Sequence, residues 1–157
     1  MIASLKRVAT ALALAGLAQG GAAQATCWSE DAVEAAQIRT LETMLMVASL
    51  RCRDSGTDLL PSYNAFVRGH RAMLTVMNDR LRAHFGNLNA YDRYVTSVAN
   101  RYGGGAIGLD CEDMAGLLAS ARNASGSADE LTGIAQKARI RASIPGERCA
   151  VTLAQAR

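Results

Sequence analysis

Apolar side chains recur every three or four positions over most of residues 29–142. That spacing places them on one face of an α-helix, where they can be buried together. The pattern is clearest between residues 58 and 86, where its members are Tyr63, Val67, His70, Leu74, Met77, Leu81 and His84. Because no segment shows a convincing strand pattern, we predict an all-α protein.

Capping residues and helix breakers divide this region into about five helices. The predicted helices begin at Ser29, at Asp58, near residue 89, at Asp110 and at Ser127. The second ends at Gly86, a favourable C-terminal stop, and the fifth ends before Pro145. Short connections favour an up-and-down bundle, which is followed by an irregular tail over about 143–157.

Six of the seven aromatic residues lie on the second and third predicted helices, and Trp28 is the exception. Aromatic rings bury large areas, so we expect the bulkiest part of the core where these two helices meet. Methionines at helical spacing are predicted to be ordinary core residues, and the alternative is an adaptable binding groove. They are Met44, Met46, Met73, Met77 and Met114.

Residues 1–25 have the three-part layout of a secretory signal peptide. Lys6 and Arg7 form a positive start, an apolar run follows over residues 8–18, and small residues stand at Ala23 and Ala25. The apolar run is shorter than the roughly 20 residues that span a membrane. We therefore predict a mature chain, residues 26–157, that forms a single helical domain without a membrane span, in the periplasm or secreted.

Four cysteines in an exported chain are most simply explained as two disulfides. Cys27 and Cys52 would lie about 36 Å apart near opposite ends of the first helix, which excludes a bond between them. In an up-and-down bundle, Cys52 and Cys111 come to the same end. We therefore prefer a Cys52–Cys111 bond, which leaves Cys27 to pair with Cys149. The alternative is a redox-active pair, but the chain has no Cys-x-x-Cys motif.

The charge balance argues against a nucleic-acid partner. The chain of 157 residues has a formal net charge of +3, from 17 basic and 14 acidic side chains. Removal of the leader takes away two basic residues and leaves 15 basic against 14 acidic side chains. Nucleic-acid binding relies on an excess of positive charge, so we expect a protein or an envelope component as the partner instead.

The candidate contact residues lie on the second and third predicted helices. Arg68 and Arg71 flank His70 in the sequence, and Tyr63 and Tyr94 come from the aromatic-rich segments. Arginine attracts anionic groups, and a histidine can act as a general base or a pH sensor. The alternatives are a solvated basic face and a core histidine whose nitrogens are satisfied by neighbouring groups.

No residue pattern predicts catalysis, a metal site or a cofactor. His70 and His84 would lie about 21 Å apart on one helix, so they cannot share a metal ion. The glycines at 103–105 lack the spacing and the following lysine of a phosphate-binding loop, and we interpret them as a flexible connection. Without a usable Ser-His-Asp pattern, an enzyme is not expected.

Three segments and one cysteine resemble a group of short exported proteins of Gram-negative bacteria that has no characterised function. The segments cover residues 45–52, 63–67 and 91–100, and the cysteine is Cys111. The resemblance implies a four-helix-like fold and a pairing of Cys52 with Cys111. It transfers no catalytic or binding residue.

These observations favour a non-catalytic binding or accessory protein of the cell envelope. The alternative is a carrier of a small apolar or anionic ligand between the helices. A cavity lined by Tyr63, His70 and Tyr94 would favour the carrier. A solid core with an exposed apolar patch of several hundred Å² would favour a partner-binding protein.

Overall fold

The protein is described by a computed structural model that covers residues 27–106 and 108–150. Its helices are α1 (Glu30–Arg51), the 3-10 helix η1 (Cys52–Ser55), α2 (Leu60–Gly69), α3 (Arg71–Phe85), α4 (Leu88–Tyr102), α5 (Cys111–Arg122) and α6 (Ala128–Lys137). These residues contain no β-strand, so the predicted all-α fold is confirmed, with six α-helices in place of about five. The predicted signal peptide, 1–25, and the end of the predicted tail lie outside the described residues.

Two disulfides tie the helices together, with the predicted pairing. Cys52–Cys111 joins the end of α1 to the start of α5, and its Cα atoms are 5.8 Å apart. Cys27–Cys149 joins the two ends of the described chain, with Cα atoms 4.8 Å apart. Because such bonds persist in oxidising compartments, they indicate a non-cytoplasmic location.

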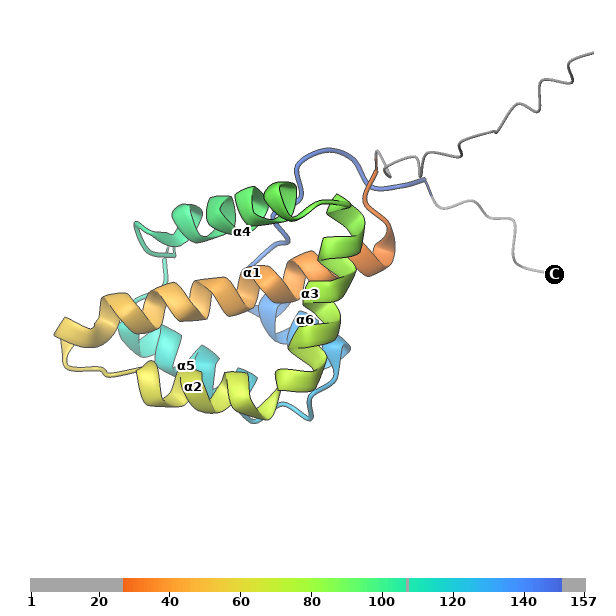
Figure 1. The fold of residues 1–157 in the computed structure, drawn as a ribbon. Helices are drawn as coiled ribbons and strands as arrows, with labels where there is room; N and C mark the ends of the chain where they lie inside the picture. Colours follow the sequence, from red (N-terminus) through yellow and green to blue (C-terminus); the bar gives the residue numbers. More distant parts are fainter. Residues whose placement is uncertain (1–26, 107, 151–157) are drawn as a thin grey trace, which may run out of the picture.

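The sixth helix arises because the predicted second helix is divided at Gly69 and His70. His70 has φ −107° and ψ 13°, so it ends α2 and precedes α3. Figure 1 shows α3 running across the direction of α1 and α2. The prediction of one helix over 58–86 was wrong. The apolar spacing continues through the division and so gave no sign of it, and the weak helix propensity of Gly69 permits the chain to bend there.

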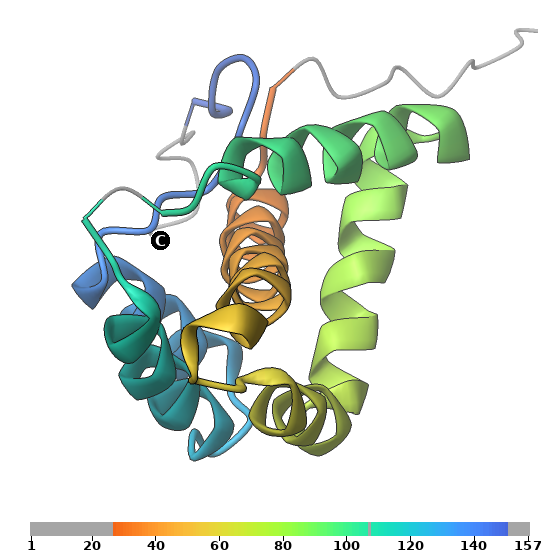
Figure 2. The same cartoon turned by 90° about the vertical axis from the view of Figure 1, so that its left-hand side faces the viewer.

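Helix α1 is the centre of the fold and contacts every other α-helix of the described residues. Figure 2 looks nearly along its axis and shows the other helices arranged around it. Its buried positions lie on all sides and include Ala35, Ala36 and Leu41, as expected for a helix that is enclosed by others. Ser29 caps it by accepting a hydrogen bond from the Ala32 amide over 3.3 Å.

The aromatic core centres on Trp28, which the sequence had set apart from the other rings. Its ring centroid lies 4.0 Å from that of His84, 5.7 Å from that of Phe85 and 5.8 Å from that of Tyr94. The Trp28 indole N–H donates to the Pro145 carbonyl over 2.8 Å, and the residue is buried. The rings of α3 and α4 do meet, as predicted, but Trp28 lies among them.

The chain after α6 returns to the N-terminus and explains the position of Trp28. Residues 138–150 contain no helix, in keeping with the predicted irregular tail. The Trp28 amide donates to the Glu147 carbonyl over 2.8 Å, and the Cys149 amide donates to the Trp28 carbonyl over 2.9 Å. These bonds lie beside the Cys27–Cys149 disulfide and fix the segment against the start of α1.

Candidate binding groove

The five residues predicted to contact a ligand or partner are distributed over separate places. They are Tyr63, Arg68, His70, Arg71 and Tyr94. The rings of Tyr63 and His70 pack near Phe66 on α2, with centroid distances of 6.4 and 5.0 Å. Tyr94 instead packs near Trp28 from α4. The two arginines are exposed, on either side of the division between α2 and α3.

His70 is a buried histidine with one satisfied nitrogen. Its Nδ1 lies 3.0 Å from the Phe66 carbonyl oxygen, whereas its Nε2 has no hydrogen-bond partner among the described residues. The loop at Gly126 covers the ring. Nearby, the Ser125 hydroxyl and amide donate to the Glu130 carboxylate, and these bonds lower the pKa of Glu130. The expected core histidine is therefore present, with one nitrogen left unpaired.

The other perturbed groups belong to the aromatic core and its surroundings. Burial lowers the pKa of His84, which favours the neutral ring that packs on Trp28. Burial also raises the pKa of Tyr63 and of Tyr94 to about 12. The Thr40 hydroxyl lies near the Tyr94 hydroxyl and opposes this shift without forming a well-aligned hydrogen bond. These phenols therefore stay protonated at neutral pH.

A groove follows α1 on the side of α6 and of the segment that comes after it. The part with the largest volume measures about 720 Å³. Three arginines and two glutamines supply its polar groups, and three apolar residues complete it. The lining residues are Gln37, Gln136, Arg139, Ile140, Arg141, Ala142, Ile144 and Arg148.

The groove continues towards the end of α4 and the loop after it. This middle part has a volume of about 520 Å³ and shares Arg139 and Ile140 with the part of largest volume. Arg101 and Lys137 add two further cations to its lining. A narrow pocket of about 200 Å³ then shares Met44 and four other residues with the middle part. The three hollows therefore adjoin one another through shared lining residues, and we call them together the basic groove.

The turn at Arg139 shapes the groove. Helix α6 ends at Lys137 rather than just before Pro145, so the predicted fifth helix was too long. The Arg139 amide donates to the Gln136 carbonyl over 2.9 Å, and the Ile140 amide donates to the Ala135 carbonyl over 2.8 Å. This pair of bonds is a Schellman motif, which requires a left-handed residue and usually uses glycine. Here Arg139, with φ 58°, occupies that position.

Two contacts fix the segment after this turn to α1. The buried Gln37 side chain donates from Nε2 to the Ile140 carbonyl. The Ser143 amide donates to the Thr40 hydroxyl over 3.2 Å, and both residues are buried. The floor of the groove therefore has a fixed backbone, and its arginine side chains extend from that backbone.

The lining of the basic groove has a strong excess of positive charge. It contains six cations and one acidic residue, Asp110. The cations are Arg51, Arg101, Lys137, Arg139, Arg141 and Arg148. None of the six forms an ion pair within the described part of the chain, whereas Arg39, Arg80 and Arg82 do. The described residues thus bring cations together along this groove.

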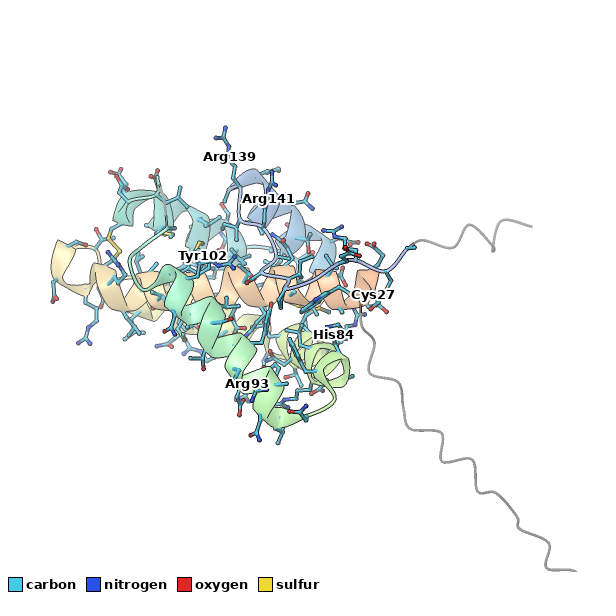
Figure 3. The ribbon with its side chains drawn as sticks, turned by 90° about the horizontal axis from the view of Figure 1, so that it is seen from above. Cys27, His84, Arg93, Tyr102, Arg139 and Arg141 are labelled. Atoms are coloured by element: carbon cyan, nitrogen blue, oxygen red, sulfur yellow. A yellow bond between two sulfur atoms is a disulfide. The ribbon has the colours of Figure 1, made fainter. Side chains whose placement is uncertain are left out.

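Figure 3 shows part of this arrangement from above. Arg139, Arg141 and Tyr102 lie to one side of α1 in this view, and Arg139 points away from the helices. His84 and Arg93 lie to the other side. The groove is therefore separate from the aromatic cluster around Trp28.

The sequence interpretation did not identify these cations as a site. They come from α1, α4, α6 and the irregular segment, and only the chain reversal at Arg139 brings them together. One local signal was available, because Lys137, Arg139 and Arg141 alternate with uncharged residues and have no acidic neighbour before Glu147. Two of the methionines considered as possible lining of a binding groove, Met44 and Met114, do line the narrow pocket.

Neither a metal-binding cluster nor a membrane-spanning helix occurs in the described residues. Residues 27–106 and 108–150 contain no group of three or more His, Cys, Asp or Glu side chains that could hold a metal ion. In the same residues, no helix is both long and apolar enough to cross a membrane.

Comparisons with protein-family models, with curated proteins and with solved structures found no match to this chain.

Proposed function

We propose that this protein is an exported, non-catalytic binding protein of the cell envelope that holds an anionic ligand in the basic groove. The observation that carries the proposal is the presence of six cations along one groove, none of which forms an ion pair among the described residues. The predicted signal peptide and the two disulfides support export to the periplasm or beyond.

The chemistry of the groove favours carboxylate, phosphate or sulfate groups. A guanidinium offers a planar set of donors that matches the oxygens of such groups in pairs. A concave surface with charges of one sign raises the local concentration of oppositely charged ligands. Ile140, Ala142 and Ile144 supply apolar contact between the arginines. A ligand with several anionic groups would pair with more of these separated cations than a ligand with one.

The exposed apolar surface gives less support to a partner that binds by hydrophobic contact. The large apolar side chains that are most exposed are Leu50, Val76 and Leu88, and they belong to α1, α3 and α4. The cavities that form the groove are not lined by Tyr63, His70 or Tyr94. The groove therefore favours an anionic ligand over the apolar one, at a place other than the aromatic helices.

Calorimetric titration with inorganic tripolyphosphate tests this proposal. The oxidised mature protein should bind it in a salt-dependent way. The double variant Arg139→Gln/Arg141→Gln should bind at least about tenfold more weakly, because a hydrogen bond to a charged group contributes about 1.5–3 kcal/mol.

A matched control distinguishes the effect of losing cations in the groove from the effect of lowering the net charge of the protein. The double variant Arg68→Gln/Arg71→Gln removes the same charge from exposed positions outside the groove. Its affinity should stay within about twofold of that of the unmodified protein, since distant charges are screened. Equal losses in the two double variants, or no binding to the unmodified protein, would refute the proposal.

A further inference from the structure

The narrow end of the basic groove differs in character from the rest. Its pocket of about 200 Å³ lies beside the Cys52–Cys111 disulfide, and Met44, Ala48, Tyr102, Leu109 and Met114 give it mainly apolar walls. Met44 and Met114 are almost fully buried, and thioether side chains adapt readily to the shape of an apolar group. A cavity of about 150 Å³ is large enough to hold benzene, so this pocket has room for about six carbon atoms.

A fixed cation stands at the rim of this pocket. The Arg51 guanidinium donates to the Gly103 carbonyl over 2.5 Å and lies against Gly105. Gly105 has φ +99°, and a Cβ atom there would lie 3.4 Å from the Arg51 Cζ atom. A Cβ atom at that distance would be in ordinary van der Waals contact, so it is the positive φ that favours glycine here. Only one of the five guanidinium N–H groups is needed for the Gly103 bond, which leaves others for an anion.

The single acidic residue of the lining is already engaged. The Asp110 carboxylate accepts hydrogen bonds from the amides of Glu112 and Asp113, each over 2.9 Å, and so caps α5. This capping directs its charge towards the positive end of the helix. The pocket lining therefore holds one cation, Arg51, and one carboxylate that caps α5, and Arg101 and Lys137 lie in the adjoining part.

We infer that the ligand is a monomeric amphiphilic anion, whose apolar end of about six carbons enters the pocket beside Cys52–Cys111 while its anionic group lies among the cations of the groove. The inference rests on the proposed function and specifies its ligand. Adjacency supports it, because the pocket and the middle of the groove share Met44, Tyr102, Gly105, Ala106 and Leu109. The two hollows therefore lie side by side, as a ligand with an apolar end and an anionic end requires.

A series of n-alkyl phosphates, from methyl to octyl and below their micelle concentrations, tests the inference by calorimetric titration. The phosphate head group is the same throughout the series, so any change in affinity is due to the alkyl tail. Affinity should rise about fourfold for each methylene that enters the pocket, and the rise should stop near hexyl phosphate. Octyl glucoside, which has a tail without charge, should bind far more weakly than octyl phosphate.

A pocket-filling variant and its control locate the effect. Ala106→Leu enlarges a side chain that lines the pocket and the middle of the groove, and it should weaken hexyl phosphate binding at least about tenfold more than methyl phosphate binding. Ala72→Leu makes the same change at an exposed position of α3 and should have no effect. If Ala106→Leu does not fold, the alkyl series on the unmodified protein still decides the question.

The outcomes separate this inference from the proposed function. If tripolyphosphate binds but affinity does not depend on chain length, the amphiphile inference is wrong and the anionic groove remains. If neither probe binds, both are wrong. Binding to phosphatidylglycerol vesicles without binding to soluble alkyl phosphates would also overturn the inference, because the ligand would then be a membrane surface.

Discussion

Trp28 shows how one side chain can determine the course of a whole segment. Its indole N–H and its backbone together form three hydrogen bonds to residues 145–149, and its ring fills the space between α3 and α4. The floor of the basic groove is part of the segment that these bonds hold. The backbone of Trp28 is bridged to that of Arg148, so Trp28 helps to position one arginine of the groove.

His84 should make stability depend on pH through its contact with Trp28. Burial lowers the pKa of His84 below its ordinary value of 6.5, so the unfolded chain takes up a proton first as the pH falls. The contribution of His84 is complete above about pH 6.5 and is lost as the pH falls through the folded-state pKa.

The variant His84→Phe keeps a ring on Trp28 and removes the titrating group. Its urea unfolding midpoint should fall less than that of the unmodified protein when the pH is lowered from above 6.5 to well below it. If both proteins lose the same amount, His84 is not a source of the pH dependence.

At the scale of elements, the boundaries depend on local backbone conformation more than on apolar spacing. The division of the predicted second helix at Gly69 and the early end of α6 at Arg139 were both missed. In each case the apolar stripe continues past the boundary, so periodicity could not reveal it. Arg139 was especially hidden, because the left-handed position of a Schellman motif is normally marked by glycine.

Two glycine variants test how the backbone conformation at a helix end affects stability. Gly69 is the last residue of α2, has open space around its Cα and lacks a left-handed φ, so Gly69→Ala should stabilise the protein by up to about 1 kcal/mol. Gly86 caps α3 with φ 68°, so Gly86→Ala should destabilise it by about 1–2 kcal/mol.

Urea unfolding of the oxidised protein measures both changes, and each variant serves as the control for the other. A loss of stability in Gly69→Ala would mean that the division between α2 and α3 requires the backbone freedom of glycine.

At the scale of the whole molecule, both disulfide pairings were predictable from the sequence, whereas the crossing direction of α3 and the tight turn at Arg139 were not. The Cys52–Cys111 pair was predictable because successive helices bring those residues to one end. The disulfides close loops with sequence separations of 59 and 122 residues, each contributing roughly 4–5 kcal/mol by chain entropy. The groove was not predicted, because Arg51 and Arg101 are distant in sequence from the cations of residues 137–148 and only the folded chain brings them to one side.

The distribution of charge was hidden from the sequence in the same way. The overall charge balance was used to argue against a nucleic-acid partner, and it says nothing about where the charges lie. Salt bridges such as Arg80–Glu34, at 2.6 Å, pair three arginines outside the groove with carboxylates, whereas the cations of the groove have no such partner among the described residues. Net charge alone therefore could not locate an anion-binding surface.

Backbone ¹⁵N–¹H NMR of the oxidised protein during titration with hexyl phosphate tests the central claim most directly. We predict saturable shift changes at residues 101–111 and 136–148 and on the adjoining face of α1, with no change at residues 63–71. Saturable changes confined to residues 63–71, where the sequence placed most of its contact residues, would contradict the account, as would the absence of any change.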